Sequence, residues 1–416
     1  MSHLHDRNHP AMSVNLPAIR FRPRAILTAA LVAIVLAGCD APDARFRLDM
    51  VNVRVQELRF GDYTPDHLQQ VSDALTAMFG TPDEPYLVPG SGMASVVNLS
   101  NVQRAAGPVR RDESGLTVSG LFREHCVHCH GVTGDGAGPT ALFLNPYPRD
   151  YRMGIFKFKS TPKGAKPTHD DLLRILTNGV PGTAMPSFKT LTEGELEALV
   201  DYVKYLAIRG EVERDLYTEI GITGELELSK GYLVDTALAR VVGKWQEAPE
   251  RVTEIPQRPD FDVQESIARG RELFYGGGAC VTCHGPTQLG DGTTNDYDDW
   301  TKEWYQHADD DSALAAEFMH RGAMPPRNIL PRNLRQGVYR GGRRPIDIYL
   351  RIANGIDGAP MPGASAANPQ EVVAGQPSAS LSSDDIWHLV NYVRSLPYDE
   401  LSRPTRPRES AMRERL

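Results

Sequence analysis

The sequence is poor in cysteine, has no surplus of positive charge, and contains only a short strongly apolar run. Five cysteines in 416 residues are too few for a disulfide framework. Acidic residues outnumber basic ones by 53 to 45, so the chain is negatively charged and nucleic acid is not an expected partner. The apolar run, from Ala25 to Ala37, is shorter than the roughly 20 residues that span a bilayer. The informative residues lie instead in a few short patterns.

The apolar run closes a predicted export signal. Basic residues between Arg20 and Arg24 precede it and small residues end it, which is typical of a signal peptide covering residues 1–38. The ending Leu-Ala-Gly-Cys resembles a bacterial lipoprotein box, in which Cys39 becomes the lipidated N-terminus. Ordinary cleavage nearby, with Cys39 left as a free thiol, is the alternative, but an unpaired exported thiol is a liability. We therefore expect a lipid-anchored protein on the periplasmic side of a bacterial membrane.

The other four cysteines lie in two copies of one pattern, Cys-x-x-Cys-His, at residues 126–130 and 280–284. This pattern is typical of c-type haem attachment. Two residues between the thiols let both reach the vinyl groups of one porphyrin from a single helical turn, and the adjacent histidine then reaches the iron. The chain is therefore expected to hold two covalently bound haems c. The predicted attachment residues are Cys126, Cys129, Cys280 and Cys283, and the predicted proximal ligands are His130 and His284.

Two other kinds of site use paired cysteines. Zinc ribbons place their two Cys-x-x-Cys pairs about 15–20 residues apart, whereas Cys129 and Cys280 are separated by most of a domain. A thiol–disulfide exchange site of the thioredoxin kind needs a strand–helix–strand setting, and the flanks of both motifs have helical patterns. Zinc and a redox-active dithiol remain as alternatives, and both fit the spacing less well than haem does.

From about Thr117 onward the chain consists of two units whose short elements follow in the same order. Each unit has a Leu-Phe pair before the haem motif, a Gly-Asp-Gly element after it, and then Pro-Arg followed by Asp or Asn. Further on, Asn-Gly comes seven residues before a methionine, and an amphipathic helix closes the unit. The matched pairs are Leu121-Phe122 with Leu273-Phe274, Gly134–Gly136 with Gly290–Gly292, Pro148–Asp150 with Pro331–Asn333, Asn178-Gly179 with Asn354-Gly355, and Leu191–Leu206 with Leu381–Leu396.

Each unit resembles a class I cytochrome c domain, over roughly residues 117–208 and 264–398. The resemblance implies an all-α fold in which a helix leads into the haem motif and a closing helix crosses it. It also implies a methionine as the second axial ligand, which would put Met185 on one iron with His130, and Met361 on the other with His284. Thioether sulfur is a soft ligand suited to haem iron, and His/Met ligation raises the reduction potential.

The methionine of the second unit has a rival. Met324 and Met361 both precede a proline. Met361 follows an Asn-Gly pair and is followed by the closing helix, as Met185 is in the first unit, whereas Met324 precedes the Pro-Arg-Asn element. The repeat therefore favours Met361 as the predicted ligand.

Arg149 and Arg332 occupy matched places after the two haem motifs. In the family that the units resemble, such arginines often lie near the haem propionates, where a planar guanidinium suits a carboxylate. The resemblance therefore implies propionate contacts for both residues. An ordinary surface arginine is the alternative for each.

The remaining segments have less specific patterns. Residues 39–116 predict a tether and a small N-terminal extension, with one helix from Pro65 to Phe79 that Thr64 caps and Gly80 ends. The segment after the first unit is too long for a simple linker and predicts a helix around Leu233 to Gln246. The expected organisation is 1–38 signal peptide, 39–116 tether and extension, 117–209 first cytochrome c domain, 210–263 helical linker, 264–398 second cytochrome c domain and 399–416 polar tail.

The second unit contains an insertion, residues 293–323, that the first unit lacks. It is rich in aspartate and glutamate with interleaved aromatic residues, and the stretch after it is rich in arginine. Such charges either pair internally in a folded-over segment or form a docking patch near the second haem that steers a redox partner. A calcium site among the aspartates lacks the usual loop spacing.

An iron with two protein ligands has no open position for a substrate, which favours an electron carrier over an enzyme. We therefore expect the chain to pass single electrons between a donor and an acceptor among periplasmic or membrane redox proteins. One alternative is a dihaem peroxidase, whose peroxidatic iron must lack or lose a strong distal ligand. The other is the cytochrome subunit of a larger dehydrogenase or oxidase, as in a respiratory complex.

Overall fold

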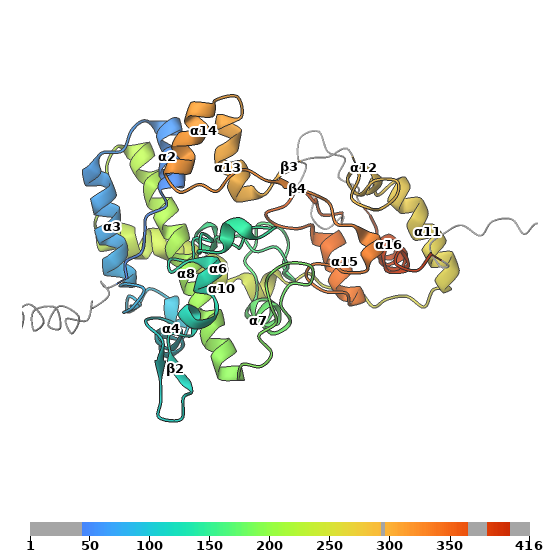
Figure 1. Cartoon of the computed structure of the whole chain (residues 1–416), viewed down its shortest axis with the longest axis horizontal. Coiled ribbons are helices and arrows are strands. Elements are labelled where there is room, and N and C mark those ends of the chain that lie inside the picture. The colour runs from blue at the N-terminus through green and yellow to red at the C-terminus, as the bar shows by residue number, and fades with distance from the viewer. Residues whose placement is uncertain (1–43, 293–295, 365–380, 400–416) are drawn as a thin grey trace, which may run out of the picture. The chain divides into compact units, whose positions relative to one another are not determined.

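The computed structural model describes residues 44–292, 296–364 and 381–399. The predicted signal peptide, the predicted lipidation residue Cys39 and nearly all of the predicted polar tail lie outside the described residues. Within those ranges the chain is mainly helical, and its sheets are two short antiparallel pairs (Figure 1). The predicted all-α class is confirmed. No helix among the described residues is long and apolar enough to span a bilayer.

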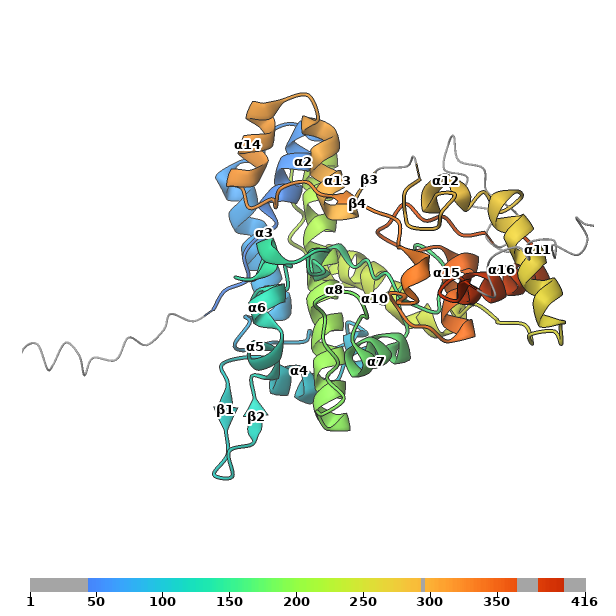
Figure 2. The same cartoon turned by 45° about the vertical axis from the view of Figure 1, so that its right-hand side comes forward.

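One long helix, α8 (Glu193–Thr223), organises the first half of the described chain (Figure 2). It begins with a capping box in which Thr192 and Glu195 satisfy each other's backbone N–H groups. Three helices of the N-terminal extension and the helix before the first predicted methionine ligand all pack on it. Much of the first hydrophobic core therefore surrounds a single element.

Helix α8 continues through the boundary that the sequence predicts between the first unit and its linker at residue 210. The apolar side chains of Val212, Leu216 and Ile220 recur at helical spacing and are all buried, so the helix keeps an inward face. It ends only at Gly224, which adopts a left-handed conformation. The first unit and the start of the linker are thus one continuous helix.

The N-terminal extension forms a layer of helices against α8. The predicted helix after Thr64 is confirmed, because the Thr64 hydroxyl accepts a hydrogen bond from the backbone N–H of His67 and Gly80 follows the last turn. The Tyr205 hydroxyl of α8 donates to the Phe79 carbonyl at the end of this helix. The helices of the extension are α2 (Met50–Phe60), α3 (Pro65–Phe79) and α4 (Leu99–Ala105).

In the first unit the expected helix before the haem motif is only five residues long. A hairpin precedes it, and Gly120, in a left-handed conformation with its Cα packed against the Pro108 backbone, separates the two. The Phe122 ring contacts Tyr202 of α8 at a centroid distance of 5.0 Å. The elements are β1 (Arg110–Arg111), β2 (Thr117–Ser119), α5 (Leu121–His125), α6 (Val127–His130), η2 (Ala141–Phe143), η3 (Tyr151–Met153) and α7 (His169–Asn178).

The connection between the two units is helical, as the sequence predicts, and it belongs to the first core. Leu238, Val241 and Val242 are buried in the cluster that surrounds α8. The segment therefore packs as part of the first domain. Its elements are α9 (Lys230–Tyr232), η4 (Leu233–Leu238), α10 (Ala239–Gln246) and η5 (Ala248–Arg251).

The second unit has the expected crossing of its first and last helices. Gly270 lies so close to the His388 carbonyl that a side chain there would have no room. The Phe274 ring meets Tyr392 at 5.5 Å, which repeats the contact between Phe122 and Tyr202. The elements are α11 (Val263–Tyr275), α12 (Val281–His284), η6 (Leu334–Gln336), α15 (Pro345–Asn354) and α16 (Ser383–Ser395).

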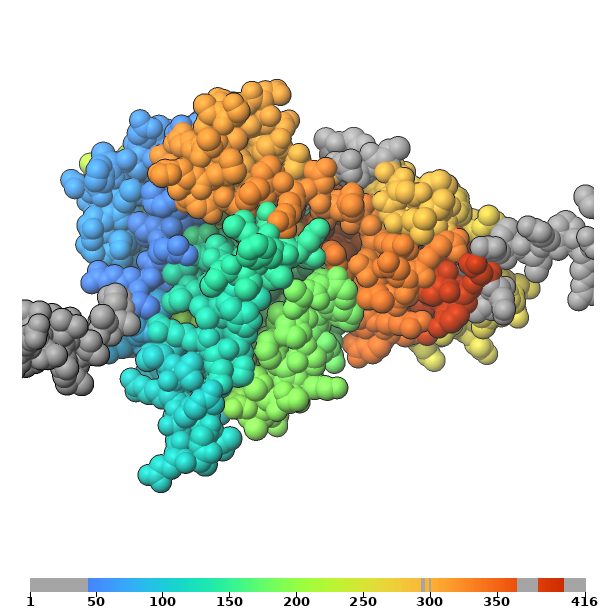
Figure 3. Space-filling model, in the orientation of Figure 1, coloured from blue at the N-terminus to red at the C-terminus, as the bar shows by residue number. Residues whose placement is uncertain are grey.

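The insertion of the second unit packs back onto the N-terminal extension. Trp304 and Phe318 are almost fully buried and form a small core with Val55 of α2. In Figure 3 the orange atoms of this segment rest on the blue atoms of the extension. The elements of the insertion region are β3 (Asp296–Tyr297), α13 (Asp299–Ala308), α14 (Ser312–His320) and β4 (Asn328–Ile329).

Four acidic residues of the insertion pair with basic residues of the same chain. These pairs favour internal pairing, one of the two alternatives for this segment, over an open docking patch. The pairs are Asp298 with Lys157 at 2.7 Å, Glu317 with Arg54 at 3.0 Å, Asp296 with Lys302 at 2.7 Å, and Glu303 with Arg214.

Candidate functional sites

Both Cys-x-x-Cys-His motifs fold into one short helical turn, α6 and α12. The backbone N–H of His130 donates to the Cys126 carbonyl, and that of His284 donates to the Cys280 carbonyl, each at 2.9 Å. The turn brings two thiols and the following imidazole onto one side, as the spacing predicts. None of the four described cysteines takes part in a disulfide.

The two motif histidines are held in the same way. The Nδ1 atom of His130 lies 3.0 Å from the Arg149 carbonyl oxygen, and Nδ1 of His284 lies 3.4 Å from that of Arg332. A carbonyl can only accept, so Nδ1 carries the proton and Nε2 is left with its lone pair available for a metal. Burial lowers the pKa of His130 to about 4 and also lowers the pKa of His284. Both rings are therefore neutral at pH 7, as metal ligation requires.

Arg149 and Arg332 orient the histidines through their backbone carbonyls and not through their side chains. The arginines themselves do not predict this role, but the residue that follows each arginine does. Asp150 and Asn333 each accept a hydrogen bond from the backbone N–H two residues later, at 2.9 and 3.0 Å, and begin the matched turns η3 and η6. This cap fixes the preceding carbonyl. An Asx residue after Pro-Arg thus marks the acceptor of the histidine proton.

The Gly-Asp-Gly elements occur in both units, but their structural register differs by two residues from the sequence match. Gly136 N donates to the His130 carbonyl and Gly290 N donates to that of His284, at 3.0 and 3.1 Å, so these two glycines are equivalent. Gln288 then stands where the first unit has Gly134, and both have positive φ, 61° and 71°. The pairing by identity is therefore wrong, because the shared backbone path fixes the positions and tolerates a glutamine at one of them.

The two predicted methionine ligands sit on loops of the same construction. Val180 N donates to the Met185 carbonyl and Ile356 N donates to the Met361 carbonyl, both at 3.1 Å. Each loop starts at a glycine after a helix, Gly179 with φ 67° and ψ −167° or Gly355 with φ 70° and ψ −163°, a region essentially reserved for glycine. The Asn-Gly pair thus fixes the path that presents the methionine.

The second site contains a cavity of about 540 Å³. Met361 lines it together with Cys280, Cys283 and His284, whereas Met324 is not among the described residues of its wall. Two residues of the first unit, Lys157 and Phe158, complete the wall. Its apolar side chains include Phe274, Ile329, Leu330, Leu334, Ile348, Ile352, Leu389 and Val393, and its cations are Lys157, Arg332, Arg340 and Arg351.

The residues of this cavity fit a c-type haem. They supply two thiols for the vinyl groups, a neutral imidazole with a free Nε2, and a thioether. The apolar wall suits the porphyrin ring, and Arg340 and Arg351 have buried N–H groups with no hydrogen-bond partner among the described residues, which suits the carboxylates. In the first site, Cys126, Cys129 and His130 occupy the same turn, and Met185 is half-buried against the first core.

The zinc alternative gains no support from the described residues. Within residues 44–292, 296–364 and 381–399, no three side chains of His, Cys, Asp or Glu lie close enough together to hold a metal ion. The two cysteine pairs therefore form separate sites. Each pair is followed by its own histidine, and in the second site Met361 lines the same cavity.

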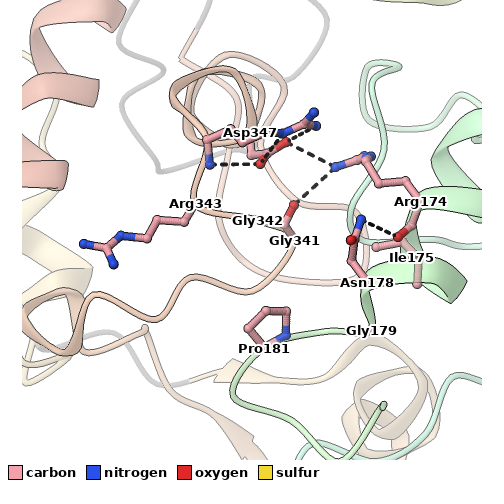
Figure 4. Close-up of a pocket in the computed structure, with 10 residues that line it drawn as sticks. Arg174, Ile175, Asn178, Gly179, Pro181, Gly341, Gly342, Arg343 and Asp347 are labelled. Atoms are coloured by element: carbon pink, nitrogen blue, oxygen red, sulfur yellow. Dashed lines mark hydrogen bonds and ion pairs between the residues drawn. The ribbon is translucent and has the colours of Figure 1, made fainter. Parts of the chain in front are cut away.

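The two units meet beside the methionine loop of the first. Arg174 of α7 reaches the Gly341 carbonyl and Asp347 of α15, both at 3.3 Å (Figure 4). These residues border a second cavity of about 300 Å³, which Gly179 and Pro181 of the first loop also line. The first methionine loop therefore lies next to the start of the helix that precedes the second loop.

Comparisons with known proteins agree with the division into two units. A protein-family model described as "Cytochrome C oxidase, cbb3-type, subunit III" matches residues 115–203, and the model "Cytochrome c" matches residues 267–397. Among solved structures, one chain of a reducing HAO-like protein complex from Kuenenia stuttgartiensis is 24% identical, with a TM-score of 0.45, and the match covers 70% of this chain and 98% of that chain. A search of curated proteins finds no match.

Proposed function

Because this chain is a cytochrome c protein with two domains of that family, we propose that it holds one covalent haem c in each domain and carries single electrons between two redox partners. A bound haem c supplies one-electron exchange at its iron. The residues of the chain would attach, orient and shield each haem. Cys126 and Cys129 would attach the first haem, and Cys280 and Cys283 the second.

The axial residues have separate tasks. The carbonyls of Arg149 and Arg332 keep the proton of each histidine on Nδ1, which orients His130 and His284 with Nε2 free for the iron. The Asn-Gly turns hold Met185 and Met361 on matched loops. With a histidine and a methionine bound, each iron would have no open position for a substrate, so the two sites would suit electron exchange and not substrate turnover.

The single observation that supports this proposal is the repetition of the methionine loop. A dihaem peroxidase needs one iron whose distal position is open or can open. Here both loops have the same backbone hydrogen bond, the same glycine conformation and a methionine at the same place. The geometry therefore favours two closed sites of the same kind.

The spectra of the oxidised protein test the proposal. We expect two covalently bound haems per chain by the pyridine haemochrome assay, and two low-spin His/Met signals by electron paramagnetic resonance. Met185→Ala and Met361→Ala should each convert one haem to a form that binds carbon monoxide, while Met324→Ala serves as the matched control and should change neither. A bis-His or high-spin signal in the unmodified protein would favour the peroxidase. A spectral change in Met324→Ala alone would move the second ligand to that residue.

Lipidation at Cys39 would place the carrier on the periplasmic side of a membrane, where a donor and an acceptor are redox proteins of the envelope. Bacterial lipoprotein anchors hold more than one acyl chain, which is enough for stable attachment. The Cys39→Ser variant should be absent from the membrane fraction and should still contain both haems. Retention of that variant in the membrane, together with co-purifying subunits, would instead favour the cytochrome subunit of a larger complex.

A further inference from the structure

Arg351 is the most unusual side chain of the second cavity. It lies on α15, is only 7% exposed, and is one of the residues that line the cavity. Its Nη2 donates to the Lys159 carbonyl of the first domain at 2.6 Å, while Nε and Nη1 have no partner among the described residues. A buried guanidinium with unused N–H groups is costly unless an anion reaches it.

A second arginine shares this condition. Arg340 also lines the cavity, and its buried Nε has no partner among the described residues. Burial and the neighbouring cation Arg332 lower the pKa of Arg340, and Asp298 partly offsets both effects. No Asp or Glu is among the described residues of the cavity wall. The acids whose charges act on these two arginines each have another cation as a partner: Asp298 pairs with Lys157, Asp171 with Arg174, and Asp347 with Arg344.

The unsatisfied groups identify the chemistry of what they bind. Two arginines with unpaired N–H groups in the wall of an apolar cavity suit a flat apolar molecule that carries two carboxylates at one edge. The haem that the proposed function places here has that structure. Resting on that function, we propose that Arg340 and Arg351 bind the two carboxylates of the second haem at the contact between the two domains.

The first domain takes part in this site. Phe158 lines the cavity, and the Arg351 guanidinium lies 5.7 Å from the centre of its ring. The next residue, Lys159, supplies the carbonyl that holds Arg351. The second site is therefore complete only when segment 157–159 of the first domain is in place, and the carboxylates would be bound where the two domains meet.

The first domain lacks the corresponding cation. Counting back from the matched Asn-Gly pairs, Ile175 of α7 occupies the place of Arg351 on α15. An isoleucine cannot bind a carboxylate. The carboxylate anchor on this helix is therefore specific to the second domain and is not a property of the repeated unit.

Redox titration of the purified full-length protein tests the inference. Arg351→Met and Arg340→Met should each leave two haems per chain and lower the reduction potential of the second haem only. A nearby cation destabilises the oxidised haem more than the reduced haem, so its removal favours the oxidised state. We expect a shift of roughly tenfold in the reduction equilibrium, about 59 mV for a one-electron couple. The potential should also become more dependent on pH, since the released carboxylates titrate nearer neutrality.

Two further variants keep the test decisive. Arg343→Met removes an arginine of the same segment that does not line this cavity, and it should change neither potential. Arg351→Lys keeps the charge and should shift the second potential less than Arg351→Met; it also replaces that variant if the methionine fails to fold. Unchanged potential and pH dependence in the Arg340 and Arg351 variants, with both haems present, would overturn the inference and leave the proposed function intact. A parent protein without a second haem would overturn the function itself.

Discussion

The two haem-binding domains present their ligands through the same turns but surround them differently. In the first, the Tyr151 ring stacks on His130 at 4.8 Å, and the helices of the extension wrap the same core. In the second, Leu334 takes the place of Tyr151, a smaller core surrounds α16, and arginines face the cavity. The repeated parts are those fixed by backbone hydrogen bonds, and the parts that differ set the charge and support of each site.

The charged side chains around the two sites differ. Around the first histidine, Asp135 and Asp150 are buried and pair with Arg47 and Arg152, at 2.8 Å each. At the second, the cavity wall holds cations with no Asp or Glu among its described residues. Two haems with the same proposed ligands would therefore have different reduction potentials, because the charged groups around them differ.

The largest effect is expected from the glycine that begins each methionine loop. At Gly355 an added Cβ would lie 2.7 Å from the Met361 carbonyl oxygen, in a backbone conformation that L residues rarely adopt. Gly355→Ala should therefore displace Met361 and abolish the low-spin spectrum of the second haem while leaving the first unchanged. Gly179→Ala should do the reverse. If either variant disturbed both haems equally, the domains would not be independent at this level.

A loss of stability in the first domain should follow from a change in the second. Trp304→Ala empties the core that the insertion shares with Val55 of α2, and large aromatic to alanine changes in cores cost about 3–5 kcal/mol. Thermal unfolding monitored at each haem should show the effect in the first domain as well as in the insertion. Tyr305→Ala, at a partly buried position beside this core, is the milder control.

A smaller effect is the difference between the two potentials. With four cations in the wall of the second site and buried acids near the first, the second haem should have the higher potential, and electrons should run from the first domain to the second. Potentiometric titration of Met185→Ala and Met361→Ala beside the parent protein assigns each potential to a domain. A higher potential at the first haem would contradict this charge comparison.

The smallest effect concerns Asp150, which stands where the second domain has Asn333. Burial, partly offset by Arg152, raises the pKa of Asp150 to about 6. A carboxyl whose pKa is raised by folding binds more protons in the folded state, so its contribution to stability falls as pH rises from about 4 to 6. Asp150→Asn should remove this slope while keeping the cap of η3. Denaturant titrations of both proteins at several pH values measure it.

Most of the correct predictions come from the internal repeat of the two cytochrome c units. Asn178-Gly179 and Asn354-Gly355 predict the same loop because only glycine adopts that turn, and Thr64 and Gly80 mark the ends of α3 for similar reasons. Residue identity and local conformation are tightly linked at such positions. Secondary structure and the relation between the two methionine loops could therefore be inferred before any packing was known.

What the sequence did not reveal depends on tertiary contact. The hydrogen bonds that the Arg149 and Arg332 carbonyls accept do not depend on the arginine side chains, so residue identity does not predict them. Trp304 packs against Val55 of α2, which is far away along the chain. The continuation of α8 past residue 210 was hidden because Gly210 suggested a boundary, although it packs closely on the Arg152 backbone. The partnerless groups of Arg351 likewise become visible only once the cavity exists.

The packing of the insertion on α2 has a consequence for the order of assembly. Export of the chain from its N-terminus, as proposed above, would expose Val55 long before Trp304 and Phe318 arrive. The outer layer of the first domain would then close only after most of the chain has been delivered. During that interval Cys126 and Cys129 would stay accessible for haem attachment, and the insertion of the second domain would complete the first domain last.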